Sequence, residues 1–254
     1  MSAPSTSTLT EDAIFHGAIR LRQRRGGYRF TEDAVLLAEF AVRTGAVREA
    51  ADFGAGCGVV GLMLLHVGAA ARVVGVELQT SLAALAIHNA RANELESAYH
   101  LLRADLRDSP IASASLELIV SNPPYRPLRA GQLPADQERA VARHEIACSP
   151  VELCREAARC LASGGRLALV YPEARLEGVQ SALEGAGLAV CRIRHVHPAP
   201  HRPPTQVLIE SVRTDEVPHL VIEPPLVTHD EGGERSAEMS RILAGDWGSL
   251  ASGR

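Results

Sequence analysis

The sequence Ser121-Asn122-Pro123-Pro124-Tyr125 directly follows the apolar run Leu116-Glu117-Leu118-Ile119-Val120. A short run rich in leucine and β-branched residues predicts a buried strand, and a double proline cannot continue that strand. We therefore place the Asn-Pro-Pro-Tyr tetrapeptide at the carboxyl end of a strand. Open α/β sheets bind their ligands at this end.

The residue types of the tetrapeptide suit the binding of a planar nitrogen. The side-chain oxygen of Asn122 and the carbonyl of Pro123 both accept hydrogen bonds, and the prolines fix the backbone that carries this carbonyl. Tyr125 adds a flat face on which a base or an amide can stack. The structural alternative is a proline-rich turn with a capping asparagine, so the surrounding sequence has to decide.

Three strands are predicted before this one, at residues 49–53, 72–76 and 99–102. The first contains Asp52 and leads into the glycine loop, Gly54-Ala55-Gly56-Cys57-Gly58, whose glycines let the backbone approach a ligand closely. The second strand ends at Glu77 and the third ends near Asp105. Since the carboxyl ends of parallel strands meet at one edge, we expect these acidic residues to share that edge.

The remaining pattern alternates helices and strands. Helices are predicted at residues 34–42, where Thr31 is the candidate N-cap, at 59–67, 82–92 and 151–161, and from Pro172 onward. Further strands are predicted at residues 166–171, 188–196 and 206–212. The proline-rich loop between the last two is too short for a crossover helix, so we expect these two strands to pair antiparallel.

A dinucleotide site is one interpretation of the glycine loop. Residues 56–61 read Gly-Cys-Gly-Val-Val-Gly, a literal G-x-G-x-x-G, and Glu77 follows at about the 20-residue spacing of an NAD-binding oxidoreductase. However, the tight turn begins at Gly54, so the match starts two residues late. An oxidoreductase also gives no reason for Asp105 or for the proline-locked Asn122.

A methyl donor that carries an amino acid, a ribose and an adenine explains all of these features. From about residue 48 to 212 the sequence resembles the class I S-adenosylmethionine-dependent methyltransferases. The resemblance implies a doubly wound, Rossmann-like α/β fold with a seven-stranded, mostly parallel sheet, an antiparallel last strand and helices on both faces. It also implies that Asp52 lies beneath the methionine amine, Glu77 binds the ribose and Asp105 faces the adenine. The implied S-adenosylmethionine site comprises Thr31, Asp52, Gly54, Ala55, Gly56, Gly58, Glu77, Leu78, Asp105, Leu106 and Asn122.

The same resemblance makes Asn122, Pro123 and Tyr125 the catalytic grip on the target amine. In the Asn-Pro-Pro-Tyr subclass this target is adenine N6 in nucleic acid or the side-chain amide of a protein glutamine, and the tetrapeptide does not separate them. Only about 50 residues precede the glycine loop, too few for the helical domain of the glutamine enzymes. Residues 27–38 are also similar to the entry motif of the valine tRNA adenine-37 N6-methyltransferase family, so we expect RNA, most simply tRNA, as substrate. A non-catalytic RNA-binding module remains a further alternative.

The charge of the chain favours local rather than general contact with nucleic acid. The net charge is −4, and all 26 basic residues are arginines, which bind phosphate through a planar fork. The predicted nucleic-acid-binding residues are Arg24, Arg25, Arg29, Arg126, Arg129 and Arg202, although such runs are often only solvated. His195, His197 and His201 stand among prolines without a nearby carboxylate or cysteine in sequence, so no metal site is predicted.

The rest of the sequence limits compartment and organisation. The five cysteines contain no Cys-x-x-Cys pair, and no apolar run is long enough for a membrane span, so we expect a cytoplasmic protein with reduced thiols. No homo-oligomer is predicted. Residues 1–13 are expected to be loose. The expected organisation is an Arg-rich segment with an entry helix (1–45), a methyltransferase domain (46–213) and a C-terminal extension (214–254).

Overall fold

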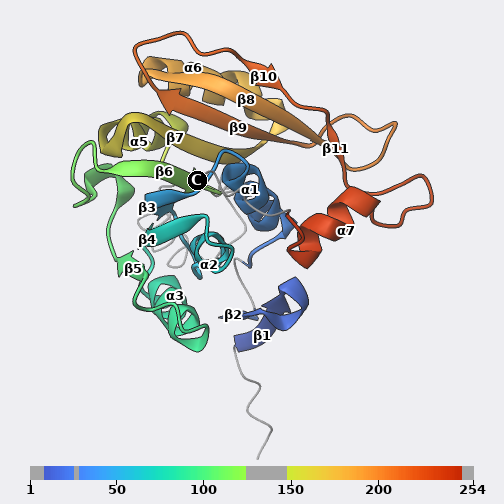
Figure 1. Ribbon diagram of the computed structural model, residues 1–254, viewed down its shortest axis with the longest axis horizontal. Helices are drawn as coiled ribbons and strands as arrows, with labels where there is room; N and C mark the ends of the chain where they lie inside the picture. Colours follow the sequence, from blue (N-terminus) through green and yellow to red (C-terminus); the bar gives the residue numbers. More distant parts are fainter. Residues whose placement is uncertain (1–8, 26–28, 124–147, 248–254) are drawn as a thin grey trace, which may run out of the picture.

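The predicted strands pair side by side in one twisted sheet (Figure 1). The computed structural model describes residues 9–25, 29–123 and 148–247. From one edge to the other, the sheet contains β10 (Val221–Ile222), β8 (Leu188–His197), β9 (Gln206–Arg213), β7 (Leu161–Pro172), β6 (Leu116–Ser121), β3 (Val47–Phe53), β4 (Ala70–Val76) and β5 (Tyr99–Leu102), and β11 (Leu226–Val227) also pairs with β8.

The strand directions confirm the predicted α/β class. β7, β6, β3, β4 and β5 pair parallel with one another, whereas β9 pairs antiparallel with both β7 and β8. The short loop between β8 and β9 requires the antiparallel pairing of these two strands. For the described part of the chain, the predicted count of seven strands is too low by two. The two-residue strands β10 and β11 of the C-terminal extension add to the edge of β8, and segments this short carry no periodicity that a sequence pattern would reveal.

Helices cover both faces of the sheet because its central strands bury side chains on both sides. In β6, Leu118 and Val120 belong to one core, whereas Leu116 and Ile119 belong to the other. The first core includes residues of α1 (Glu32–Val42), α2 (Val59–His66), α3 (Thr80–Ala92) and α7 (Ala237–Ala244). The second core includes residues of α5 (Pro150–Cys160) and α6 (Leu176–Gly185). The carboxyl edge of the parallel strands lies between these two layers.

The N-terminal hairpin corrects an expectation from the sequence. Residues 9–13, expected to be loose, belong to β1 (Leu9–Ile14), which pairs antiparallel with β2 (Ile19–Arg24) through the short turn η1 (Phe15–Gly17). In β2 the even positions carry arginines and the odd positions are buried. The arginine run is therefore an amphipathic strand in which buried residues alternate with arginines. This alternation was missed because the run was interpreted by its charge.

Candidate functional site

The glycine loop, residues 54–58, joins β3 to α2 in a backbone conformation that favours glycine. Gly54, Gly56 and Gly58 have φ values of 75°, 58° and 86°. The N–H groups of Gly54 and Ala55 both donate to the Val76 carbonyl, at 2.9 and 3.0 Å, and so fix the loop at the end of β4. A Cβ at Gly54 would meet no atom within 4 Å, so the loop faces open space there.

Glu77 supports this loop from the end of β4. Its Oε2 accepts a hydrogen bond from the Gly56 N–H at 2.9 Å, and its Oε1 accepts one from the Gln79 N–H at 2.7 Å. The residue is only 6% exposed. Burial raises the pKa of the carboxyl, and the backbone donors oppose that rise. Each oxygen keeps a lone pair for a further donor.

Asp52 lies beneath the same loop. It is 2% exposed, and its Oδ2 accepts a hydrogen bond from the Gly61 N–H in α2 at 3.0 Å. Burial raises the pKa of Asp52 to about 7, and the charge of Glu77 adds to the rise. Within the described ranges, no basic side chain forms an ion pair with either carboxylate. The described part of the site therefore offers two buried acceptors that no basic side chain there neutralises.

The predicted adenine side of the site is more exposed. Leu78 is 39% exposed, an apolar side chain open to the ligand edge. Asp105 caps the short helix η2 (Leu106–Asp108), and both of its oxygens accept hydrogen bonds from the Arg107 guanidinium. This hydrogen bonding and the adjacent positive charge lower the pKa of Asp105. Because the Arg107 pair is solvent-exposed, its contribution to stability is small.

Asn122 and Pro123 follow β6 directly, next to the strand that leads into the glycine loop. The buried Ser121 hydroxyl donates to the Phe53 carbonyl at 2.7 Å and ties the two strand ends together. Asn122 and Pro123 are both partly buried. Sequence reasoning missed Ser121 as a positioning residue, although a serine at a strand end is a signal for such a bond. Tyr125 lies outside the described residues.

Thr31 occupies the N-cap position of α1, as predicted. Among the described residues its side chain makes no capping hydrogen bond, and its backbone carbonyl accepts from the Ala34 N–H at 3.1 Å. Ala55 is buried within the glycine loop, and Leu106 begins η2. The cofactor roles of these three residues stay predictions.

The arginines predicted to bind nucleic acid differ in their surroundings. Arg24 and Arg25 are exposed at the end of β2, and Arg202 is exposed in the loop between β8 and β9. Arg29 instead donates to both oxygens of Asp12, each at 3.0 Å, and therefore helps to hold the N-terminal hairpin. Arg126 and Arg129 lie outside the described residues.

The three histidines do not converge: His195 and His197 lie in β8, and His201 lies in the loop that follows. His195 Nδ1 lies 3.0 Å from Glu173 Oε2, and His201 Nε2 lies 3.3 Å from Glu231 Oε1. Both carboxylates are distant from the histidines in sequence, so the sequence pattern did not show them. In the part of the chain that the structure describes, no three histidine, cysteine or acidic residues gather as a metal site would require. None of the helices described there has the length and apolarity needed to cross a membrane.

Comparisons with known proteins agree on one family. Residues 32–186 match the model of the methyltransferase small domain. Two relatives, the tRNA1(Val) (adenine(37)-N6)-methyltransferases of Porphyromonas gingivalis and Parabacteroides distasonis, are each 30% identical to the chain. The alignments cover 84% and 75% of this chain and 86% and 81% of the relatives. A solved structure of an Agrobacterium tumefaciens protein, described as an O-methyltransferase, matches with a TM-score of 0.68 at 21% identity, over 84% of this chain and 96% of that one. This last match shows a shared fold.

Proposed function

Because the chain belongs to the methyltransferase small domain family and, within it, resembles tRNA1(Val) (adenine(37)-N6)-methyltransferases over most of its length, we propose that it methylates N6 of an adenine in tRNA with S-adenosylmethionine as donor. The observation that carries the proposal is the juxtaposition of two features. The glycine loop held by Glu77 leaves the sheet at β3, and Asn122-Pro123 leaves it at the adjacent strand β6. A donor and an acceptor amine bound there would meet at one edge.

The residues of the glycine loop fit S-adenosylmethionine. Its ammonium and its ribose diol are hydrogen-bond donors, and Asp52 and Glu77 are buried acceptors that have only backbone partners among the described residues. The open space at Gly54 leaves room for close approach of a ligand to the backbone. Leu78 supplies an exposed apolar surface for the adenine. We assign the ammonium to Asp52 and the ribose to Glu77.

The chemistry is a direct displacement in which the bound cofactor supplies a methyl group already activated on its sulfonium. The difficulty lies with adenine N6, because its lone pair is delocalised into the ring. The Asn122 side-chain oxygen and the Pro123 carbonyl accept the two N6 hydrogens and favour a nitrogen whose lone pair points at the methyl group. The same dipoles stabilise the positive charge that develops on N6. As the N6–methyl bond forms and the methyl–sulfur bond breaks, N6 becomes cationic and acidic enough to release one of its protons to water without a dedicated base, so we assign none.

The proposed tRNA contacts are the exposed arginines at two places on the described surface. Arg24 and Arg25 stand at the end of the N-terminal hairpin, and Arg202 stands at the ligand edge between β8 and β9. Arg126, Arg129 and the stacking residue Tyr125 belong to the proposal by sequence alone. A protein that acts on tRNA without membrane or metal is expected in the cytoplasm.

Transfer of a tritiated methyl group tests the proposal. The protein is incubated with labelled S-adenosylmethionine and, separately, with total tRNA, DNA and a release-factor-like protein, and the products are analysed as nucleosides and amino acids. We expect N6-methyladenosine in tRNA. Label found only in glutamine would mean that the substrate is a protein and not tRNA. Cofactor binding without methyl transfer to tRNA, DNA or protein would favour a non-catalytic RNA-binding protein.

A further inference from the structure

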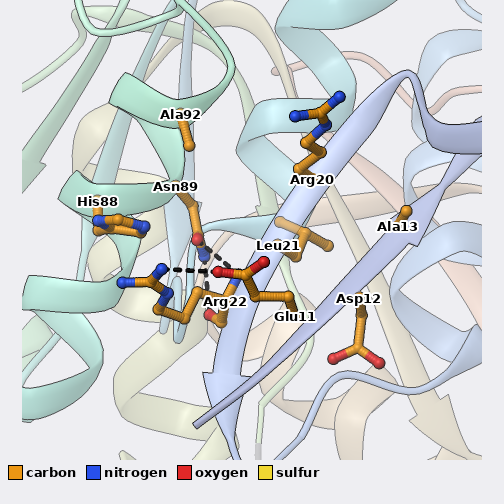
Figure 2. Close-up of a pocket in the computed structure, with 9 residues that line it drawn as sticks. All are labelled: Glu11, Asp12, Ala13, Arg20, Leu21, Arg22, His88, Asn89 and Ala92. Carbon is orange, nitrogen blue, oxygen red and sulfur yellow. Dashed lines mark hydrogen bonds and ion pairs between the residues drawn. The ribbon is translucent and has the colours of Figure 1, made fainter.

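One buried asparagine connects the N-terminal hairpin to the glycine loop. Asn89 lies on α3 and is 0% exposed. Its Oδ1 accepts a hydrogen bond from the Arg22 N–H of β2 at 2.7 Å, and its Nδ2 donates to the Arg22 carbonyl at 3.1 Å (Figure 2). The same Nδ2 donates to the Cys57 carbonyl of the glycine loop at 2.9 Å. A single amide thus satisfies backbone groups of both segments.

Asn93, the C-cap residue that follows α3, makes a similar set of contacts with β2 without reaching the loop. It accepts from the Arg20 N–H at 2.8 Å and donates to the Arg20 carbonyl at 2.7 Å. Its other side-chain bond, at 2.7 Å, goes to the Asn89 carbonyl of α3. The two side-chain amides pair with the backbone N–H and C=O groups of Arg20 and Arg22, as a neighbouring strand would. Of the two, Asn89 alone also bonds the glycine loop.

The bond to Cys57 completes the fixation of the loop. The Gly56 N–H is held by Glu77 on one side, and the Cys57 carbonyl is held by Asn89 on the other. Gly58 then begins α2 and donates to the Ala55 carbonyl at 2.8 Å. The Gly56 N–H belongs to the peptide between residues 55 and 56, and the Cys57 carbonyl belongs to the peptide between residues 57 and 58. Glu77 and Asn89 therefore restrain the loop on both sides of the Gly56–Cys57 peptide.

The hairpin also packs against α3 through apolar side chains. Ile19 and Leu21 of β2, 0% and 1% exposed, belong to the same core as Leu85 of α3. Beside this packing an open pocket of about 430 Å³ lies between the two elements, with Arg20 and Arg22 on the hairpin side and His88 and Asn89 on the helix side (Figure 2). Asn89 adds a polar connection that continues from β2 to the glycine loop, so a displacement of β2 would reach the Cys57 carbonyl through this one amide.

We propose that Asn89 is a positioning residue that couples the N-terminal hairpin to the glycine loop, so that tRNA bound along the hairpin tightens cofactor binding. The coupling rests on the proposed function, since it concerns the cofactor and RNA assigned above. By linkage, bound cofactor tightens tRNA binding by the same factor.

The test compares Asn89→Ala with the matched variant Asn93→Ala. Each substitution removes bonds to a β2 backbone, but only the first removes the bond to the loop. Calorimetry measures the affinity for S-adenosylhomocysteine with and without tRNA. In the wild type we expect tRNA to tighten binding about fivefold or more. In Asn89→Ala we expect affinity without tRNA to fall about tenfold, because the buried Cys57 carbonyl loses its donor, and the tRNA effect to disappear. Asn93→Ala should keep both the affinity and the effect.

A second variant and a second measurement distinguish a loss of coupling from a general folding defect. Asn89→Asp keeps the side-chain volume and the acceptor for the Arg22 N–H but removes both Nδ2 donor bonds, so it should also lose the coupling. Hydrogen exchange at residues 54–58 should accelerate in both Asn89 variants and stay unchanged in Asn93→Ala. Equal effects at the two positions, or an Asn89 variant with wild-type exchange and coupling, would overturn the proposal. A wild type that binds no S-adenosylhomocysteine contradicts the proposed function instead, while loop exchange still decides the role of Asn89.

Discussion

Buried charges are arranged in opposite ways in two regions of the sheet. Beside β3 and β4, Asp52 and Glu77 accept hydrogen bonds from backbone N–H groups, and within the described residues no basic side chain pairs with them. Beside β8 and β9, the charge network formed by Arg192, Arg194, Glu210, Glu223 and Glu238 pairs buried arginines with carboxylates. Among the described residues, the first region leaves its acceptors without an opposite charge, whereas the second pairs its charges with one another. Only Arg192 Nε and Arg194 Nη1 of that network are buried there without a hydrogen-bond partner.

The contacts of the charge network show what a structural arrangement requires. Arg192 contacts Glu210 and Glu223, each at 2.9 Å, and its guanidinium lies 3.7 Å from the centre of the Phe40 ring. Arg194 contacts Glu238 of α7 at 2.7 Å. These bonds hold the C-terminal extension on the sheet. Burial is thus common to both regions, and they differ in the partners of the buried groups: the arginines pair with carboxylates, whereas the carboxyl groups predicted to bind the cofactor have only backbone donors among the described residues.

The largest expected effect is on stability, in the charge network. Arg192→Ala leaves Glu210, which is 2% exposed, with weaker compensation, and we expect a loss of about 3–5 kcal/mol in the free energy of unfolding. Urea denaturation measures it. Arg72→Ala is the matched control, because its 2.6 Å pair with Glu49 is solvent-exposed and should contribute less than about 1 kcal/mol. Equal losses in the two variants would remove the distinction between the regions.

The next effect is on rate, at the ligand edge. Asn122→Ala removes one of two acceptors for the target amine, and we expect single-turnover methyl transfer to fall by about 10²–10³-fold. The free energy of unfolding and the affinity for S-adenosylhomocysteine should change little, because the side chain is only partly buried. A near-wild-type rate would show that the grip assigned to Asn122 is wrong.

Glu77→Ala should act on cofactor affinity. Loss of a charged acceptor for the ribose is expected to cost about 1.5–3 kcal/mol of binding free energy, measured by calorimetry with S-adenosylmethionine. Glu49→Ala, which removes a partly exposed carboxylate from β3, serves as the control and should leave affinity unchanged. Tight binding of NADH without any response to S-adenosylmethionine would favour the oxidoreductase interpretation.

The titration of Asp52 should have a smaller effect, on the free energy of unfolding, and this effect depends on pH. Its folded-state pKa of about 7 exceeds the unfolded value of 3.8, so between these values the folded protein holds an extra proton. The stability of the protein without ligand therefore falls as pH rises toward 7 and levels off above it. Between pH 6 and pH 8 this loss is about 1.4 kcal/mol for one titrating group. Asp52→Asn should abolish it, as the difference between the two denaturation profiles shows. A profile unchanged by Asp52→Asn would contradict the assignment.

The smallest effect concerns the exposed arginines. Replacement of Arg24 and Arg25 by alanine should weaken tRNA binding and lower its salt slope by roughly one for each phosphate that the variant no longer neutralises. Binding measured over a series of salt concentrations gives this slope, and protein stability should not change. An unchanged slope would mean that these side chains are only solvated.

Much of the sheet was predictable because its strands are apolar and bounded by clear signals. The strand at Tyr99–Leu102 has the predicted limits. The strand before Asn-Pro-Pro-Tyr ends at Ser121, one residue later than the predicted apolar run. The N-terminal hairpin was not predictable in the same way. β1 contains a glutamate and an aspartate in six residues, and its stability depends on partners such as Arg22 and Arg29 that are distant in sequence.

The candidate site shows a similar limit. The glycines and acidic residues could be placed at one edge because each follows a predicted strand, and the edge is a property of topology. Asn89 could not be recognised, because its role depends on β2 lying against α3. The pairing of Asp105 with Arg107 was equally hidden, although the two residues are neighbours, since nothing in the spacing indicates where the guanidinium points.

The position of β9 between β7 and β8 has a consequence for the order in which the protein is assembled during synthesis. β8 pairs with β9, β10 and β11, and all three are later in the chain. The carboxylate partners of Arg192 and Arg194 are later as well. A ribosome that has made the chain through β7 has already delivered five parallel strands that pair with one another, including β3, which contains Asp52, and β4, which leads to Glu77. The parallel part of the sheet is thus complete early, whereas β8 remains an unpaired strand with two uncompensated arginines until β9 and the C-terminal extension emerge.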